Sequence, residues 1–192
     1  MALSEFLSGL VGGICVLIGV YVTHKLSESK RHNEQADIIK GVLQGLHDEI
    51  ETLWEIYTER VGKIVETLQD GQGFEGYWVV SQDYFTVYSS NAHLIGQITD
   101  VDLRKEIIST YTIAKSLLDT FRMNNELVSR LEQSSLLANE TNKEEHKQEV
   151  IMRRQQVALY AAGLKQIHAD LKTRTSSLLR NLRKYGVLNE RQ

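Results

Sequence analysis

The chain has 192 residues, and its 22 basic and 25 acidic side chains give a formal net charge of −3, which does not favour nucleic-acid binding. Proline is absent, whereas a chain of this length ordinarily contains about nine or ten, so we expect long uninterrupted helices. The single cysteine, Cys15, excludes a disulfide framework and a cysteine-ligated zinc site within one chain.

An apolar run, FLSGLVGGICVLIGVYVT, extends from Phe6 to Thr23. At ~1.5 Å per residue, its roughly 18 residues can cross a hydrocarbon core of ~30 Å. A cleavable signal peptide would carry basic residues before the run, but Glu5 stands there. We therefore interpret residues 1–23 as a retained transmembrane anchor, with a buried core helix as the alternative.

The charges that flank this run predict its orientation. Lys25, Lys30 and Arg31 follow it, and no Lys or Arg precedes it. Because basic residues favour the cytoplasmic side, we expect a single-pass protein of the cell (inner) membrane. Its amino terminus would lie outside, and the rest of the chain would be cytoplasmic.

The apolar run also carries small residues on one broad face. Such a face lets two backbones approach closely in lipid, so it favours self-association into a homo-oligomer. The alternative is that glycine is simply common in membrane helices. The small residues are Ser8, Gly9, Gly12, Gly13, Cys15 and Gly19.

After the anchor we expect a solvated helical stalk at 24–37 and a cytoplasmic helical bundle at 38–192. The stalk has one large aliphatic residue, Leu26, and no Gly to interrupt a helix. Apolar residues then recur in steps of three and four, as in a coiled-coil heptad, until Gly71, Gly73 and Gly76 end the helix. The recurring residues are Ile39, Leu43, Leu46, Ile50, Leu53, Tyr57, Val61, Ile64 and Leu68, widened by Val42, Trp54 and Val65.

The segment 74–95 is rich in aromatic residues and is a possible partner surface. We expect a short helix from about Gln82 to Ile95 within it, ending at Gly96. The segment would either cap the membrane-distal end of the bundle or pack as a fourth, shorter helix. The candidate partner residues are Tyr77, Trp78, Tyr84, Phe85 and Tyr88.

Two further long helices complete the predicted fold. Asp100 is a candidate N-cap for a helix that should run back toward the membrane. Polar residues from Ser134 to Glu145 would connect it to a last helix at about 143–185, with Gly186 as the C′ residue. The expected inner faces comprise Leu103, Ile107, Tyr111, Ala114, Leu118, Phe121, Val128 and Leu131, then Val150, Val157, Ala161, Leu164, Leu171, Leu178, Leu182 and Tyr185. The predicted fold class is all-α: a transmembrane helix and stalk leading into an antiparallel three- to four-helix bundle.

Motifs for catalysis, metals or cofactors are not found. No two of the six histidines are spaced three or four residues apart, as a helical metal site requires. We interpret His168 as a hydrogen-bonded residue at the edge of the core. We therefore predict a protein that is not an enzyme and has no metal site and no cofactor.

Two polar features remain. The C-terminal stretch holds a possible basic patch for an acidic partner or lipid head groups, although a solvated helix end explains it equally simply. Its members are Lys172, Arg174, Arg180, Arg183 and Lys184. Asn124 and Asn125 fall at the inner face of the third helix, where a polar residue can fix register; simple exposure is the alternative.

The stretch YWVVSQDYFTVYSSNAHLIGQITDVDLRKEIISTYTIAKSLLD, from Tyr77 to Asp119, resembles uncharacterised bacterial single-pass membrane proteins with a cytoplasmic helical domain. Some of these are similar in layout to effectors of phage-defence systems, and the resemblance brings no catalytic motif. The sequence thus favours a non-enzymatic, self-associating membrane module that recruits or senses an unknown cytoplasmic protein. The alternative is an oligomeric antiviral effector that perturbs or perforates the membrane.

Overall fold

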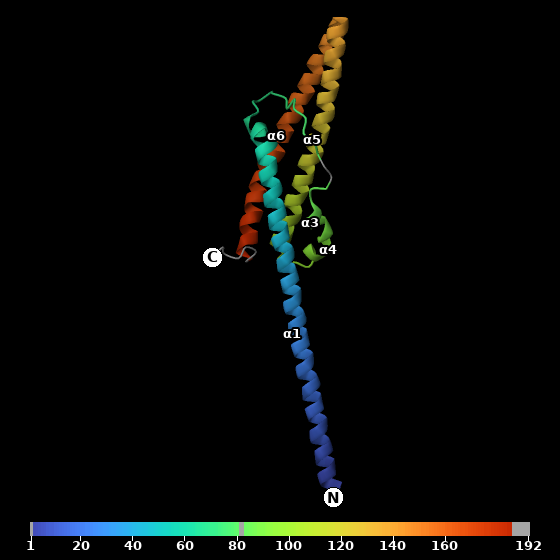
Figure 1. Ribbon diagram of the computed structural model, residues 1–192, viewed down its shortest axis with the longest axis vertical. Coiled ribbons are helices and arrows are strands. Elements are labelled where there is room, and N and C mark those ends of the chain that lie inside the picture. Colours follow the sequence, from blue (N-terminus) through green and yellow to red (C-terminus); the bar gives the residue numbers. More distant parts are fainter. Residues whose placement is uncertain (1, 81–82, 186–192) are drawn as a thin grey trace. The chain divides into compact units, whose positions relative to one another are not determined.

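The computed structural model describes the backbone of residues 2–80 and 83–185, and within these ranges the side chains from residue 19 onward (Figure 1). No strand occurs in these ranges, which confirms the all-α prediction. The elements are α1 (Ala2–Tyr57), the π-helical turn η1 (Thr58–Gly62), α2 (Lys63–Thr67), α3 (Thr86–Ser90), α4 (Ala92–Ile95), α5 (Val101–Thr141) and α6 (Glu144–Lys184).

The chain divides into two compact units, Met1–Gly41 and Val42–Gln192. In the first unit, every side chain from 19 to 38 is exposed. Among the residues whose side chains are described, no helix is both long and apolar enough to cross a membrane. Most of the predicted anchor, including Ser8, Gly9, Gly12, Gly13 and Cys15, lies outside those residues. Gly19 is described, and a Cβ added there would meet open space.

The first part of the second unit follows the predicted heptad until a π-helical turn shifts its register. Val61 and Val65 are buried, whereas Ile64 is 52% exposed, so the prediction that Ile64 faces the core is wrong. The physical reason is η1, because a π-turn adds a residue to the helical repeat and rotates the following side chains. The helix then ends close to the predicted glycines, with Leu68 as the C-cap of α2.

The direction of α5 differs from the prediction. Tyr111 hydrogen-bonds to Leu46 and, ten residues later in each helix, the rings of Phe121 and Tyr57 pack together. The Val42–Tyr57 part of α1 and α5 therefore run in the same direction, and α6 runs antiparallel to both. The expected up-and-down order is wrong because the segment between α2 and α5 returns along the bundle before α5 begins.

This returning segment packs along the side of the bundle as a fourth, shorter element. Phe74 and Trp78 pack on Phe121 of α5, and Phe85 packs on Tyr111. The predicted short helix is two shorter helices, α3 and α4, which meet at Asn91. Gln82, its predicted start, lies outside the described residues.

Helices α5 and α6 form a hairpin that is tighter than predicted. The expected connection from Ser134 to Glu145 is wrong, because α5 continues to Thr141 and only Asn142 and Lys143 separate the helices. Ser134 is buried and continues the inward spacing of α5, while its polar neighbours are on the exposed side. Asn142 adopts the left-handed conformation (φ 51°) that ends a helix.

The start of α5 is as predicted. The carboxylate of Asp100 accepts hydrogen bonds from the amides of Asp102 and Leu103, both at 2.9 Å, which is N-cap geometry. The last helix begins after Lys143 and ends before Tyr185, also as expected. Tyr185 itself is 46% exposed, so its predicted place on the inner face is wrong; it lies beyond the last turn of α6. Gly186 lies outside the described residues.

Candidate functional site

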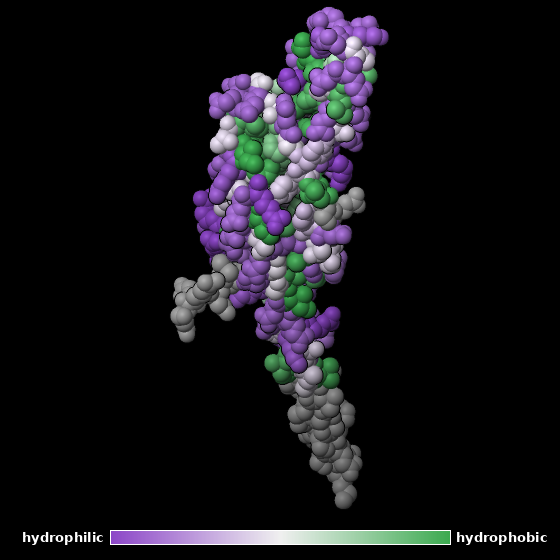
Figure 2. Space-filling view, turned by 45° about the horizontal axis from the view of Figure 1, so that its top comes forward, coloured by the Kyte–Doolittle hydropathy of each residue, from purple (hydrophilic) through white to green (hydrophobic). Residues whose placement is uncertain are grey.

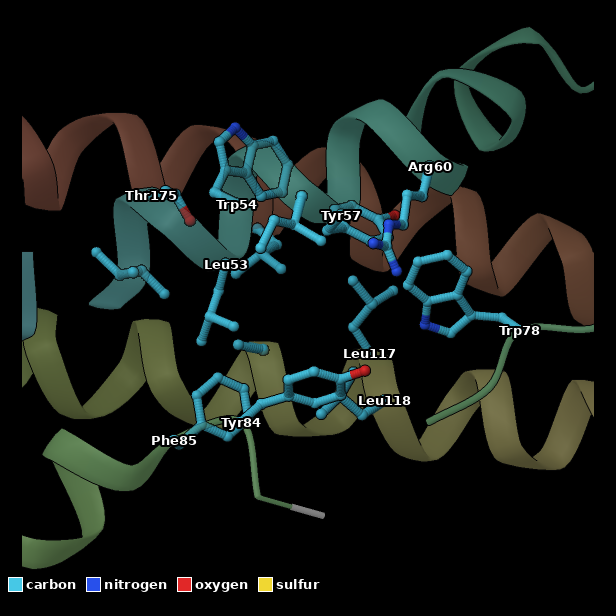
Figure 3. A pocket seen from close by; sticks show the side chains of 14 residues that line it. Leu53, Trp54, Tyr57, Arg60, Trp78, Tyr84, Phe85, Leu117, Leu118 and Thr175 are labelled. Carbon is cyan, nitrogen blue, oxygen red and sulfur yellow. The ribbon is translucent and has the colours of Figure 1, made fainter. Parts of the chain in front are cut away.

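An apolar cavity of about 230 Å³ lies in the middle of the second unit, between α1, the returning segment, α5 and α6 (Figure 3). Its exposed lining residues are Ile56 and Arg60, so we place its mouth there. The lining comprises Ile50, Leu53, Trp54, Ile56, Tyr57, Arg60, Trp78, Tyr84, Phe85, Ala114, Leu117, Leu118, Leu171 and Thr175.

The cavity exists because small side chains occupy inward positions at this level of the bundle. Ala114 on α5 and Thr175 on α6 lie one helical turn from the larger Tyr111 and Leu178, and all four are buried. Protein interiors are normally filled to crystal-like density, so a space of this size is exceptional. An engineered cavity of about 150 Å³ already binds benzene. The cavity is therefore large enough for a small organic ligand.

Two buried polar atoms in the lining lack hydrogen-bond partners among the described residues. They are the indole Nε1 of Trp78 and the hydroxyl of Thr175, whose side chain is fully buried. Leaving a buried polar group unpaired costs about 1–3 kcal/mol. Figure 3 shows Thr175 at one end of the cavity and Trp78, with Arg60, at the other. The cavity thus has an apolar middle and a polar group at each end.

Beside the cavity, a chain of polar side chains fixes one of its walls. Tyr57 lines the cavity and its hydroxyl lies 2.7 Å from His168 Nδ1; His168 Nε2 lies 3.0 Å from Glu66, which also accepts from Lys172 at 2.7 Å. A carboxylate only accepts hydrogen bonds, so we assign the His168 proton to Nε2 and the Tyr57 hydroxyl as donor to Nδ1. His168 is therefore a buried, hydrogen-bonded residue, as predicted.

The protonation states suit a structural role for this chain. Burial, together with the nearby charge of Glu66, raises the pKa of Tyr57 above its ordinary value, so the phenol stays protonated. Hydrogen bonds from Lys172 and then His168 lower the pKa of the Glu66 carboxyl. A protonated phenol held by a neutral imidazole is a poor nucleophile, and it positions the tyrosine ring as a cavity wall.

We expect the Glu66 carboxylate to make stability depend on pH. Because its pKa is lower in the folded than in the unfolded state, its contribution is complete above the ordinary value of 4.5 and is lost as the pH falls through the folded value. Urea unfolding of wild type should therefore weaken more steeply below that pH than unfolding of Glu66→Gln. Glu59→Gln, an exposed change in η1, is the control and should retain the wild-type slope. Parallel slopes for wild type and Glu66→Gln would contradict this assignment.

The structure places the five aromatic residues of the predicted partner surface mostly inward. Phe85 is buried, and Tyr88 is stacked on Tyr111 with ring centroids 4.2 Å apart. Trp78 and Tyr84 are half-buried in the cavity lining. Tyr77 is 53% exposed, and its hydrogen bond to Glu132 raises its pKa. Of this group, Tyr77 is the residue available on the surface.

The predicted basic residues are largely paired with acidic side chains. Their charges are partly neutralised within the bundle, which leaves a weaker positive surface than the sequence indicates. The pairs are Lys172 with Glu66, Arg174 with Asp170, and Arg183 with Glu51; Lys184 bonds to Asn181, and Arg180 stands on the same helix.

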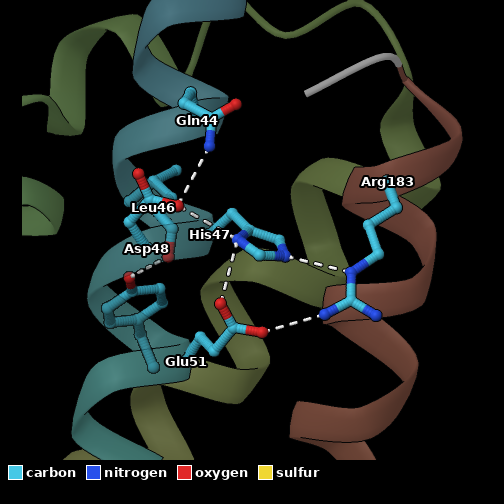
Figure 4. Close-up of polar contacts among 7 residues, drawn as sticks. Gln44, Leu46, His47, Asp48, Glu51 and Arg183 are labelled. Carbon is cyan, nitrogen blue, oxygen red and sulfur yellow. Dashed lines mark hydrogen bonds and ion pairs between the residues drawn. The ribbon is translucent and has the colours of Figure 1, made fainter. Parts of the chain in front are cut away.

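One of these pairs encloses a buried histidine that the sequence did not single out (Figure 4). Arg183 donates to His47 Nε2 at 3.3 Å and to Glu51 at 2.8 Å, while His47 Nδ1 lies 3.2 Å from Asp48. Because a guanidinium only donates, Nε2 is the acceptor and the His47 proton lies on Nδ1. This network ties the end of α6 to α1 within the second unit.

Asn124 and Asn125 hold the returning segment against α5. Asn124 is fully buried and donates to the carbonyl of Phe74 at 2.9 Å. Asn125 accepts from the Trp78 amide at 3.1 Å and donates to its carbonyl at 2.7 Å. Their predicted role as polar residues of the inner face applies to Asn124, and together they position the cavity wall at Trp78.

The largest contribution that the sequence did not reveal is Glu49. Its carboxylate accepts from the amides of Val87 and Tyr88, at 2.7 and 3.1 Å, and from the hydroxyl of Tyr111 at 2.9 Å. A carboxylate flanked by apolar residues in a heptad looks like a solvated position, so no local signal identifies it. It anchors α3 to α1.

No protein-family model, curated protein or solved structure matches this chain. Among the residues that the structure describes, no cluster of His, Cys, Asp or Glu could hold a metal ion.

Proposed function

We propose that this chain is a non-enzymatic, membrane-anchored helical module that self-associates and recruits or senses a cytoplasmic partner. The observation that carries this proposal is the uncharged run Phe6–Thr23, which is part of the same helix, α1, as the first buried residues of the bundle. The flanking basic residues favour the cytoplasm for the bundle and the cell membrane as its location.

Two features of the bundle support a binding role. The α5–α6 hairpin exposes large apolar side chains, among them Leu136 and Leu159, which are 62% and 78% exposed. Figure 2 shows hydrophobic residues among hydrophilic ones on the visible face of the second unit. Exposed apolar groups of this kind are suited to a protein partner. The Tyr57–His168–Glu66 chain, the best candidate for chemistry, has its hydrogen bonds satisfied internally.

The proposal predicts that Gly12→Ile/Gly13→Ile lowers self-association. Both side chains are apolar and should keep the segment in the membrane, but they hold neighbouring helices apart. Contacts of this kind in lipid contribute about 1–2 kcal/mol, so the cross-linked oligomer should fall roughly five- to thirtyfold at equal density in vesicles. Leu10→Ile/Val11→Ile, which changes large residues only, is the control. An unchanged oligomer distribution, or recovery of the wild-type protein in the soluble fraction, would argue against the proposal.

The second candidate is an oligomeric effector that perturbs or perforates the membrane, similar in layout to single-pass effectors of phage defence. The six small residues of the anchor favour it, because close helix packing also builds membrane assemblies. Membrane potential separates the two candidates. Depolarisation on induced expression of wild type, lost in the glycine double variant, would favour the effector; an unchanged potential would favour the recruiting module.

A further inference from the structure

We propose that the apolar cavity binds a small amphiphilic monoanion, such as a medium-chain carboxylate, whose anionic head lies at Arg60 and Trp78. The proposal concerns the second unit alone and does not depend on the anchor or on self-association. It follows from the size, lining and unpaired polar atoms of the cavity.

The size sets the length of the apolar body. A cavity of about 150 Å³ takes benzene, which has six carbons, so the 230 Å³ here suits a body of about nine or ten non-hydrogen atoms. The walls are apolar side chains, including Leu53, Leu117 and Leu171. Such walls favour a hydrocarbon chain over a sugar or a nucleotide, because each buried hydroxyl would need a partner.

The mouth provides the recognition of charge. Arg60 is exposed, lines the cavity and has no acidic partner among the described residues. The indole N–H of Trp78 is a second donor without an acceptor at this end. A guanidinium and an N–H donor together match a carboxylate, which only accepts. Tyr57 is already committed to His168, so it does not compete for the head group.

The opposite end offers one hydroxyl. Thr175 is fully buried, and its oxygen has no partner in the described part of the chain. A ligand with a hydroxyl at the far end of its hydrocarbon chain would satisfy this group. We therefore expect an ω-hydroxy carboxylate to bind more tightly than the plain carboxylate of the same length.

Binding can be measured with the protein's own fluorophores. The chain contains two tryptophans, Trp54 and Trp78, and both line the cavity. The probe is octanoate with bromine at its methyl end, which quenches tryptophan on contact. The full-length protein is reconstituted in lipid nanodiscs without detergent, and empty discs give the correction for partitioning. We expect saturable quenching with one site per chain.

Two matched pairs of variants test the two ends. Arg60→Gln should weaken binding of bromo-octanoate about tenfold, while Lys63→Gln, the same charge change outside the lining, should not. Thr175→Val should weaken ω-hydroxyoctanoate, measured by competition, about tenfold and leave octanoate unchanged. Thr173→Val, an exposed threonine of the same helix, is its control. Since Arg60 is exposed, its variant should fold even if Thr175→Val does not.

Two results would overturn the proposal. Quenching that is linear in probe, or equal in wild type and Arg60→Gln, would show partitioning without a site. Equal binding of the matching bromo-alcohol and bromo-octanoate would show that the charge is not recognised. Loss of self-association in the glycine double variant with quenching intact would separate this proposal from the proposed function.

Discussion

Phe121→Ala is expected to lower the free energy of unfolding by about 3–5 kcal/mol, the usual effect of removing a buried phenylalanine. Phe121 is fully buried on α5, and its ring packs against Tyr57, Phe74 and Trp78 with centroids 5.7 to 6.1 Å apart. It therefore joins α1, the returning segment and α5. Truncation leaves a void and removes three aromatic contacts together.

Urea unfolding of the full-length protein, followed by tryptophan fluorescence, measures this effect. Phe121→Leu retains much of the volume and should lose less stability than Phe121→Ala. Met123→Ala, on the exposed side of the same helix, is the control and should stay within about 0.5 kcal/mol of wild type. A loss below 1 kcal/mol for Phe121→Ala would mean that the three aromatic contacts are not formed.

Glu49→Ala is expected to lower the free energy of unfolding by about 2–4 kcal/mol, because it leaves buried donors without their acceptor. Three donors lose their partner: the amides of Val87 and Tyr88 and the hydroxyl of Tyr111. Tyr111 keeps a longer hydrogen bond to the carbonyl of Leu46 at 3.3 Å, which limits the loss. The larger consequence should be local, since Glu49 attaches α3.

Amide hydrogen exchange measures that local consequence. In Glu49→Ala the amides of Val87 and Tyr88 should exchange much faster, while the core of α6 changes only as global stability does. Glu55→Ala, which removes an exposed carboxylate from the same helix, is the control. Unchanged protection at Val87 and Tyr88 would contradict the assignment of Glu49 as the anchor of α3.

The sequence by itself determined the class of the protein and the ends of its long helices. The absence of proline, the three-and-four spacing of apolar residues, the glycines after Leu68 and the N-cap at Asp100 are local signals, and each acts within one or two helical turns. The same local rule explains the buried faces of α5 and α6. It also identified the apolar run at the amino terminus as the segment most suited to a membrane.

Only the tertiary structure decided how these helices are arranged and what they enclose. The direction of α5 depends on where residues 68–100 lie, and that path is set by packing of Phe74 and Trp78 on Phe121. The π-turn at Thr58–Gly62 moved Ile64 to the surface through a register change that periodicity alone does not predict. The cavity and the partners of Glu49 involve residues far apart in the chain. Such features depend on packing between distant segments, and a pattern read along one helix contains no information about the side chains that another segment will bring to it.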